Sequence, residues 1–167
     1  MNTVLNEEER KMYQHPARIR RMLAESKTIA MVGLSDKPSR PSHFVATYLQ
    51  SEGYKIVPVN PRIAGVLGEP AYPDLKSIPF PVDIVDIFRR PQECEAIVQD
   101  AIEIGAKAVW MQLSIVNRIA AKNATDHGLE VIMDRCVKME HGRYNGSLHW
   151  VGMNTEIISA KKVRRFI

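Results

Sequence analysis

The chain has 167 residues, of which 45% are hydrophobic and 25% charged, a size and composition typical of one globular domain. Its net charge of +4 suits an anionic small-molecule ligand and is too small to indicate nucleic-acid binding. No apolar segment approaches the roughly 20 residues of a membrane span, and the acidic run Glu7–Glu9 argues against a signal peptide. Cys94 and Cys136 fit neither a disulfide framework nor a zinc site, so we expect no metal and a reducing, cytoplasmic setting.

Short apolar runs alternate with helical stripes along most of the chain. Five runs have the length and composition of buried strands, at 29–32, 54–59, 82–88, 107–112 and 129–133. Apolar spacing, together with proline near a start or glycine after an end, predicts helices at 16–26, 41–52, 91–104 and 116–127. The Gly- and Pro-rich segment 63–81 is predicted to hold only a turn, a short extended piece and one helical turn at 74–77.

Strands that alternate with one-sided helices predict right-handed crossovers and a parallel sheet covered on both faces. We therefore expect an α/β fold, a Rossmann-like doubly wound sheet of five core strands in the order 3-2-1-4-5 along the chain, with helices on both faces. In that order the topological switch lies between the first and fourth strands, which predicts a ligand over 33–40 and 112–116. The expected divisions are a flexible N-terminal segment at 1–14, the Rossmann-like domain at 15–140, and a C-terminal extension with a basic tail at 141–167.

The turn after the first predicted strand carries the strongest ligand signal. Gly33 ends the apolar run and permits a sharp turn close to a ligand. The loop that follows supplies hydroxyl groups and two cations, from Ser35, Lys37, Ser39 and Arg40. This combination, placed before a helix N-terminus, suits a pyrophosphate. The same composition also fits a surface loop with capping serines, and the complete G-x-G-x-x-G pattern of NAD sites is absent.

The ends of the second and third strands narrow the choice of ligand. NAD sites usually place an acid at the end of the second strand, where this chain has Asn60-Pro61-Arg62. A cation at that point favours a ligand with an additional phosphate on its ribose, either NADP or coenzyme A, although Arg62 also fits a solvated turn. After the third strand come Phe88, Arg89 and Arg90. The ring faces either an adenine or the core, and the arginines meet either phosphate or solvent.

Other polar residues give weaker signals. Gln112 is a candidate polar contact at the end of the fourth strand. Asp83 and Asp86 are an odd number of residues apart, so they point to opposite faces of a strand and are expected to have separate structural roles. Cys136, beside a basic residue after the fifth strand, is either a reactive thiol or a buried inert one. The spacing of the histidines and acids indicates no catalytic residue and no metal site.

Several blocks of the sequence resemble, in the same order, the stand-alone CoA-binding domain proteins of bacteria and archaea. The blocks are Val-Gly-Leu-Ser-Asp-Lys-Pro-Ser-Arg-Pro-Ser at 32–42, Gly-Tyr-Lys-Ile-Val-Pro-Val-Asn-Pro at 53–61, Val-Leu-Gly-Glu-Pro-Ala-Tyr at 66–72, Val-Asp-Ile-Val-Asp-Ile-Phe-Arg-Arg-Pro at 82–91, Gly-Ala-Lys-Ala-Val-Trp-Met-Gln-Leu at 105–113 and Met-Asp-Arg-Cys at 133–136. The resemblance spans about 16–140. It implies a Rossmann-like fold that binds coenzyme A and is related to the CoA-binding domain of succinyl-CoA synthetase.

The resemblance also implies roles for individual positions. The residues implied to serve the diphosphate, with Pro38 of the same loop counted among them, are Gly33, Leu34, Ser35, Lys37, Pro38, Ser39 and Arg40. Those implied to lie near the adenosine half are Asn60, Pro61, Arg62, Phe88, Arg89 and Arg90. One departure concerns Ser114, where the family pattern has glycine and where a side chain would crowd the pantetheine path.

The resemblance gives no reaction, because ligase relatives use a phosphohistidine in a further domain and a nucleotide-binding partner. We therefore expect a protein that binds coenzyme A or an acyl-CoA, with no nucleic-acid or membrane partner. Two alternatives stay open: an NADP-dependent oxidoreductase, which needs a placed proton donor, and a nucleotide-sensing regulator, for which the first 26 residues offer no winged helix.

Overall fold

A computed structural model describes residues 2–145 of the chain, and most of the predicted C-terminal extension, including its basic tail, lies outside the described residues. Its centre is a sheet of five parallel strands in the order β2-β1-β5-β6-β7. These strands are β1 (Thr28–Val32), β2 (Lys55–Val59), β5 (Ile84–Ile87), β6 (Ala108–Met111) and β7 (Glu130–Ile132). The predicted α/β class, the five strands and their parallel pairing are confirmed.

The predicted strand order was wrong in one respect. Counted along the chain, the five strands follow the order 2-1-3-4-5, because β5 pairs with β1 on one side and β6 on the other. The prediction placed the third strand at the outer edge of β2. That edge is instead occupied by the segment that precedes β5: Tyr72 forms a bridge with Val59, and the N–H of Tyr72 donates to the carbonyl of Pro58 at 2.9 Å. The topological switch therefore lies between β1 and β5, not between β1 and β6.

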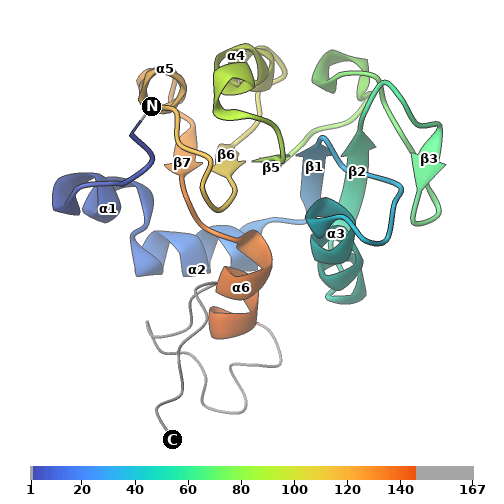
Figure 1. The fold of residues 1–167 in the computed structure, drawn as a ribbon, viewed down its shortest axis with the longest axis horizontal. Helices are drawn as coiled ribbons and strands as arrows, with labels where there is room; N and C mark the ends of the chain where they lie inside the picture. The colour runs from blue at the N-terminus through green and yellow to red at the C-terminus, as the bar shows by residue number, and fades with distance from the viewer. Residues whose placement is uncertain (1, 146–167) are drawn as a thin grey trace, which may run out of the picture.

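Helices cover both faces of the sheet, as predicted (Figure 1). On one face pack α2 (Pro16–Glu25), α3 (Pro41–Ser51) and α6 (Val137–Tyr144); on the other pack α4 (Cys94–Glu103) and α5 (Arg118–Asp126). Alternate residues of each strand point to opposite faces of the sheet. Ile29 and Met31 therefore pack in the core beneath α2, α3 and α6, whereas Ala30 packs in the core beneath α4 and α5. Burial on both faces explains why the strands read as continuous apolar runs.

The link between β2 and β5 contains little regular structure, as predicted. It holds a two-stranded ribbon, β3 (Gly65–Val66) and β4 (Glu69–Pro70), and one 3-10 turn, η1 (Leu75–Ser77), at whose N-cap Asp74 Oδ1 accepts from the N–H of Ser77 at 2.8 Å. A second 3-10 turn, η2 (Pro91–Glu93), leads into α4.

The segment 1–14, which we expected to be flexible, contains a helix that the sequence did not predict, α1 (Glu7–Tyr13). Asn6 and Glu9 form a reciprocal capping box that satisfies two backbone N–H groups. Glu9 also pairs with Arg118 of α5, and Tyr13 is buried in the core. The contact that fixes this helix comes from a residue more than 100 positions away, which local patterning does not reveal.

Helix α6 was not predicted either, and its anchor is the imidazole of His141, which is 4% exposed. Its Nδ1 lies 3.0 Å from the hydroxyl of Tyr48, and the rings of Tyr48 and Tyr54 meet it edge-on. Burial lowers the pKa of His141.

Within residues 2–145, no helix is long and apolar enough to cross a bilayer.

Acidification is expected to destabilise the fold through His141. The folded pKa lies below the unfolded value of about 6.5, so the contribution is complete above that value and falls, by at most about 1.4 kcal/mol per pH unit, as the pH drops through the folded pKa. Urea unfolding from about pH 8 to about pH 5 should show a smaller loss in His141→Gln than in the wild type. The exposed His127→Gln is the matched control, and equal pH profiles for all three proteins would contradict the assignment.

Candidate coenzyme site at the carboxyl edge of the sheet

Three loops leave the carboxyl ends of the adjacent strands β2, β1 and β5 and meet at one edge of the sheet. The loop after β1 is joined to the loop after β2, because Asn60 Nδ2 donates to the carbonyl of Leu34 at 3.0 Å. It is pressed against the loop after β5 at Gly33, where an added Cβ would lie 2.6 Å from the carbonyl oxygen of Phe88 and 2.8 Å from Cδ of Arg89. The predicted site residues on these three loops are therefore neighbours in space.

Gly33 allows the chain to make this turn. Its φ of 89° lies in the left-handed region that favours glycine, and its N–H donates to the carbonyl of Val59 at 2.9 Å. The close approach that excludes a side chain is to the chain's own backbone. Leu34, the next residue, is fully buried, so its contribution to a site is confined to its backbone.

The loop after β1 forms a short cradle in front of α3. Ser42 Oγ accepts from the N–H of Ser35 at 3.1 Å, and Ser35 Oγ accepts from the N–H of Lys37 at 3.1 Å. In the described part of the chain, the N–H groups of Asp36 and Ser39 donate to no acceptor. Arg40 occupies the N-cap of α3 without a side-chain cap. Free N–H groups before an uncapped helix N-terminus favour an anion.

Cations surround this cradle. Lys37, Pro38, Ser39 and Arg40 are exposed, and so are Pro61 and Arg62 at the end of β2. Across residues 2–145, no ion pair involves Lys37, Arg40 or Arg62. Asn60 Oδ1 accepts from the N–H of Arg62 at 2.9 Å and forms the turn that presents this arginine.

The loop after β5 is partly neutralised. Glu93 pairs with Arg89 at 2.5 Å and with Arg90 at 3.2 Å, and these two hydrogen-bonded guanidinium groups hold the pKa of Glu93 below its usual range. Phe88 is half-buried against the core formed by α2, α3 and α6. This face of the site therefore offers two cations that already share one carboxylate.

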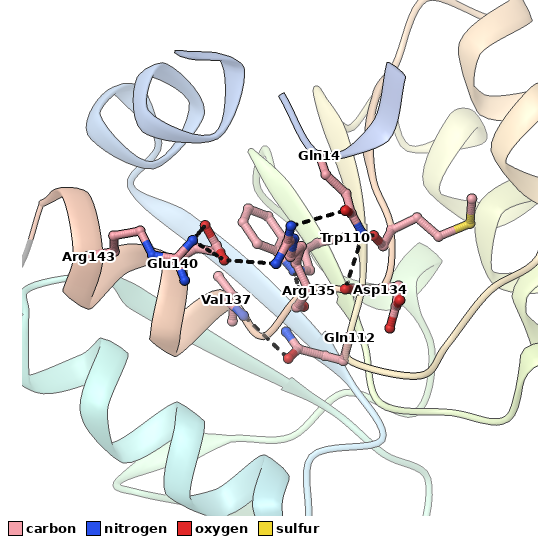
Figure 2. Close-up of polar contacts among 9 residues, drawn as sticks. Gln14, Trp110, Gln112, Asp134, Arg135, Val137, Glu140 and Arg143 are labelled. Atoms are coloured by element: carbon pink, nitrogen blue, oxygen red, sulfur yellow. Dashed lines mark hydrogen bonds and ion pairs between the residues drawn. The ribbon is translucent and has the colours of Figure 1, made fainter. Parts of the chain in front are cut away.

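Gln112 lies in a different environment from the other candidates. It is 4% exposed, and its Nε2 donates to Asp86 Oδ1 at 2.6 Å. Its Oε1 accepts from the N–H of Val137 at 3.4 Å (Figure 2). Its amide thus joins β5 to the start of α6 and, among the described residues, makes no hydrogen bond to the three loops.

Asp86, by contrast, has an environment that the sequence did not reveal. It is fully buried, and within the described chain its Oδ2 has no hydrogen-bond partner. Burial raises its pKa to about 8, against the smaller opposing effects of Gln112 and the N–H of Ile87. A group that is held neutral at the end of the central strand is a candidate functional residue that strand alternation alone did not single out.

Ser114, after β6, and Cys136, after β7, are the two residues whose roles the sequence left open. Ser114 has a φ of 67°, and its N–H donates to Asp134 Oδ1 at 2.6 Å; this conformation accounts for glycine in the related pattern. Both cysteines are free thiols, and burial raises the pKa of Cys136 although N–H groups of Met139 and Lys138 act to lower it. A raised pKa favours the inert interpretation of Cys136.

Comparison with known proteins decides the family. A model of the CoA binding domain matches residues 27–142. The chain belongs to the CoA-binding domain family. Its Bacillus subtilis relative YneT is 43% identical over 125 residues, which cover 75% of this chain and 93% of that protein. A solved Pyrococcus horikoshii structure is 41% identical with a TM-score of 0.75, covering 77% of this chain and 91% of that one.

The fold of this family also occurs within larger proteins. Part of the dinucleotide-forming acetyl-coenzyme A synthetase 1 of Ca. Korarchaeum cryptofilum superimposes with a TM-score of 0.58 at 23% identity, covering 65% of this chain and 26% of the synthetase. At this identity the likeness concerns the fold alone. Within the described part of the chain, no group of three or more acids, cysteines or histidines is placed to hold a metal ion.

Proposed function

We propose that this protein binds coenzyme A or an acyl-CoA at the carboxyl edge of β2, β1 and β5, and that it does so as a binding protein without an assigned reaction. The observation that carries the proposal is the cradle in front of α3, where, among the described residues, free N–H groups, an uncapped helix N-terminus and two cations without an ion pair, Lys37 and Arg40, occur together. A diphosphate has the charge and the oxygen spacing to fill it. The family membership supports the same ligand.

In this proposal the adenosine half of the ligand extends toward the end of β2. Arg62 is exposed beside Asn60, and the β2 turn carries no acid to accept from ribose hydroxyls. A 3′-phosphate is therefore the expected partner of Arg62, with Arg89 and Arg90 alongside. The free thiols of the described chain support a reducing, cytoplasmic setting.

Calorimetry with coenzyme A, acetyl-CoA, NADP and NAD on ligand-free protein tests the proposal. Coenzyme A or acetyl-CoA is expected to bind with one site per chain and more tightly than either dinucleotide. Tighter binding of NADP would instead favour an oxidoreductase, and the absence of CoA binding would overturn the proposal.

A second prediction concerns the 3′-phosphate. Replacing Arg62 by alanine is expected to weaken coenzyme A binding by roughly tenfold, because a charged contact to phosphate is lost. Dephospho-CoA should bind the wild type and Arg62→Ala with equal affinity, since it lacks the group that Arg62 meets. Exposed Arg20→Ala is the matched control. Unchanged CoA affinity in Arg62→Ala would remove this residue from the site.

A further inference from the structure

A cavity lies away from the three loops, between α1, the start of α2, and α6. Its volume is about 460 Å³. Its charged lining consists of Glu7, Arg10, Lys11, Arg135, Glu140 and Arg143. Its lining and the residues proposed above for coenzyme A have no member in common, so the two sites can be tested independently.

The inner wall of this cavity contains more positive than negative charge. Glu140 and Arg143 are each 3% exposed, and Arg143 Nη1 donates to the two carboxylate oxygens of Glu140 at 3.3 and 3.4 Å. Arg135 Nη1 lies 4.0 Å from the same carboxylate (Figure 2). Two guanidinium groups thus share one carboxylate. Burial raises the pKa of Glu140 although both arginines act to lower it, so its charge offsets at most one of them.

The two guanidinium groups also have unused donors. Among the described residues, no acceptor meets Nε or Nη2 of Arg143 or Nε of Arg135, although these atoms are buried. A buried donor without an acceptor and a buried charge without a counter-ion both carry a free-energy cost, unless a further group compensates them. An anion in the adjoining cavity would offset this excess charge.

The inner wall is held in place by hydrogen bonds between segments that are far apart in the sequence. Gln14, after α1, donates from Nε2 to the carbonyls of Met133 and Asp134 at 3.0 and 3.4 Å, and its Oε1 accepts from Arg135 Nη2 at 3.1 Å (Figure 2). The carbonyl of Arg135 accepts from Trp110 Nε1 at 2.8 Å. Arg135 therefore stands in a fixed position with its side chain still one-third exposed.

The outer wall adds charge of the same sign. Arg10 and Lys11 are exposed on α1, and Lys11 pairs with Glu7 at 3.2 Å. The N-terminus of α2 also borders the cavity, at His15 and Pro16, and its N-cap makes no side-chain hydrogen bond. The partial positive charge of this ten-residue helix adds to the field. Altogether four cationic side chains face two carboxylates.

We propose that this cavity binds a small phosphate-bearing anion, held by Arg10, Lys11 and Arg135 with the buried charge of Arg143 behind them. An excess of two positive charges matches a phosphate dianion, and a guanidinium fork matches its oxygens. The volume admits a small phosphorylated metabolite. The proposal does not depend on the binding of coenzyme A.

Nuclear magnetic resonance of the ¹⁵N-labelled full chain, titrated with inorganic phosphate at constant ionic strength, tests this site. The Nε–H signals of Arg135 and Arg143 and the backbone N–H signal of Ala17, in the first turn of α2, are expected to shift with one common dissociation constant. In the double variant Arg10→Gln/Lys11→Gln, this dissociation constant should rise about tenfold. Both positions are exposed, so the substitutions are not expected to disturb folding. Arg20→Gln/Lys122→Gln removes the same charge elsewhere and should leave the dissociation constant unchanged.

Three results would overturn the proposal: no shift of these signals, equal shifts with chloride, or equal affinities in the two double variants. Phosphate that binds the α3 cradle instead would shift Asp36 and Ser39, so the two sites are read separately. Shifts at Arg135 in a protein that fails to bind coenzyme A would support this site and reject the function proposed above.

Discussion

Replacing Asp86 by asparagine is expected to stabilise the protein by about 5 kcal/mol at about pH 8. The carboxyl is fully buried, its Oδ2 has no partner in the described chain, and its pKa is raised to about 8. Because the folded pKa lies above the unfolded value of about 3.9, the stability linked to this group is complete below that value and is lost as the pH rises through about 8. Asparagine keeps the shape and stays neutral throughout.

Urea unfolding of the wild type and Asp86→Asn from about pH 4 to about pH 9 measures this effect. Asp83→Asn is the matched control of opposite sign. Burial acts to raise the pKa of Asp83, but Lys107 at 2.9 Å and the N–H groups of Lys27 and Thr28 outweigh it and lower that pKa. Asp83→Asn should therefore destabilise at neutral pH. A destabilised Asp86→Asn at about pH 8 would show that Asp86 is ionised in the fold.

Replacing Gly33 by alanine is expected to destabilise the fold by about 2–4 kcal/mol and to weaken coenzyme A binding at least tenfold. The new Cβ would lie 2.6 Å from the carbonyl oxygen of Phe88, so the loops after β1 and β5 would have to separate. The left-handed φ of 89° adds strain for any L side chain. Both effects act on the turn that shapes the α3 cradle.

Gly53→Ala separates these two causes. Gly53 has a φ of 98°, but an added Cβ there would meet no atom within 4 Å. It should lose about 1 kcal/mol from backbone strain alone and bind coenzyme A as the wild type does. Chemical unfolding and calorimetry of both variants provide the comparison. Equal losses in the two proteins would mean that the contact at Phe88 does not shape the site.

Local patterning was sufficient for most elements of this fold. Apolar runs located the five strands, and Pro41 and Gly105 marked where helices begin and end. Patterning did not predict the order of the strands, because that order depends on contacts between segments far apart in the sequence. One example is the bridge between Tyr72 and Val59 at the outer edge of β2. The same limit explains α1 and α6, which are fixed by Arg118 and by the tyrosines around His141.

The candidate site could be proposed from the sequence most readily where its residues are consecutive, and its ligand contacts stay a prediction. The turn at Gly33 and the cationic loop after it can be predicted from the sequence, because the glycine, the hydroxyl groups and the charges lie within one short segment. Gln112 was harder to judge, because its hydrogen-bond partner, Asp86, lies on another strand. The charge excess behind Arg135 and Arg143 depends on three segments that meet only in the folded chain.

A crystal structure of the complex with coenzyme A tests the central claim most directly. We expect the diphosphate within hydrogen-bond distance of the N–H groups of Asp36 and Ser39 at the N-terminus of α3, and the 3′-phosphate beside Arg62. Coenzyme A bound at another surface, or a cradle left empty by saturating ligand, would contradict the account.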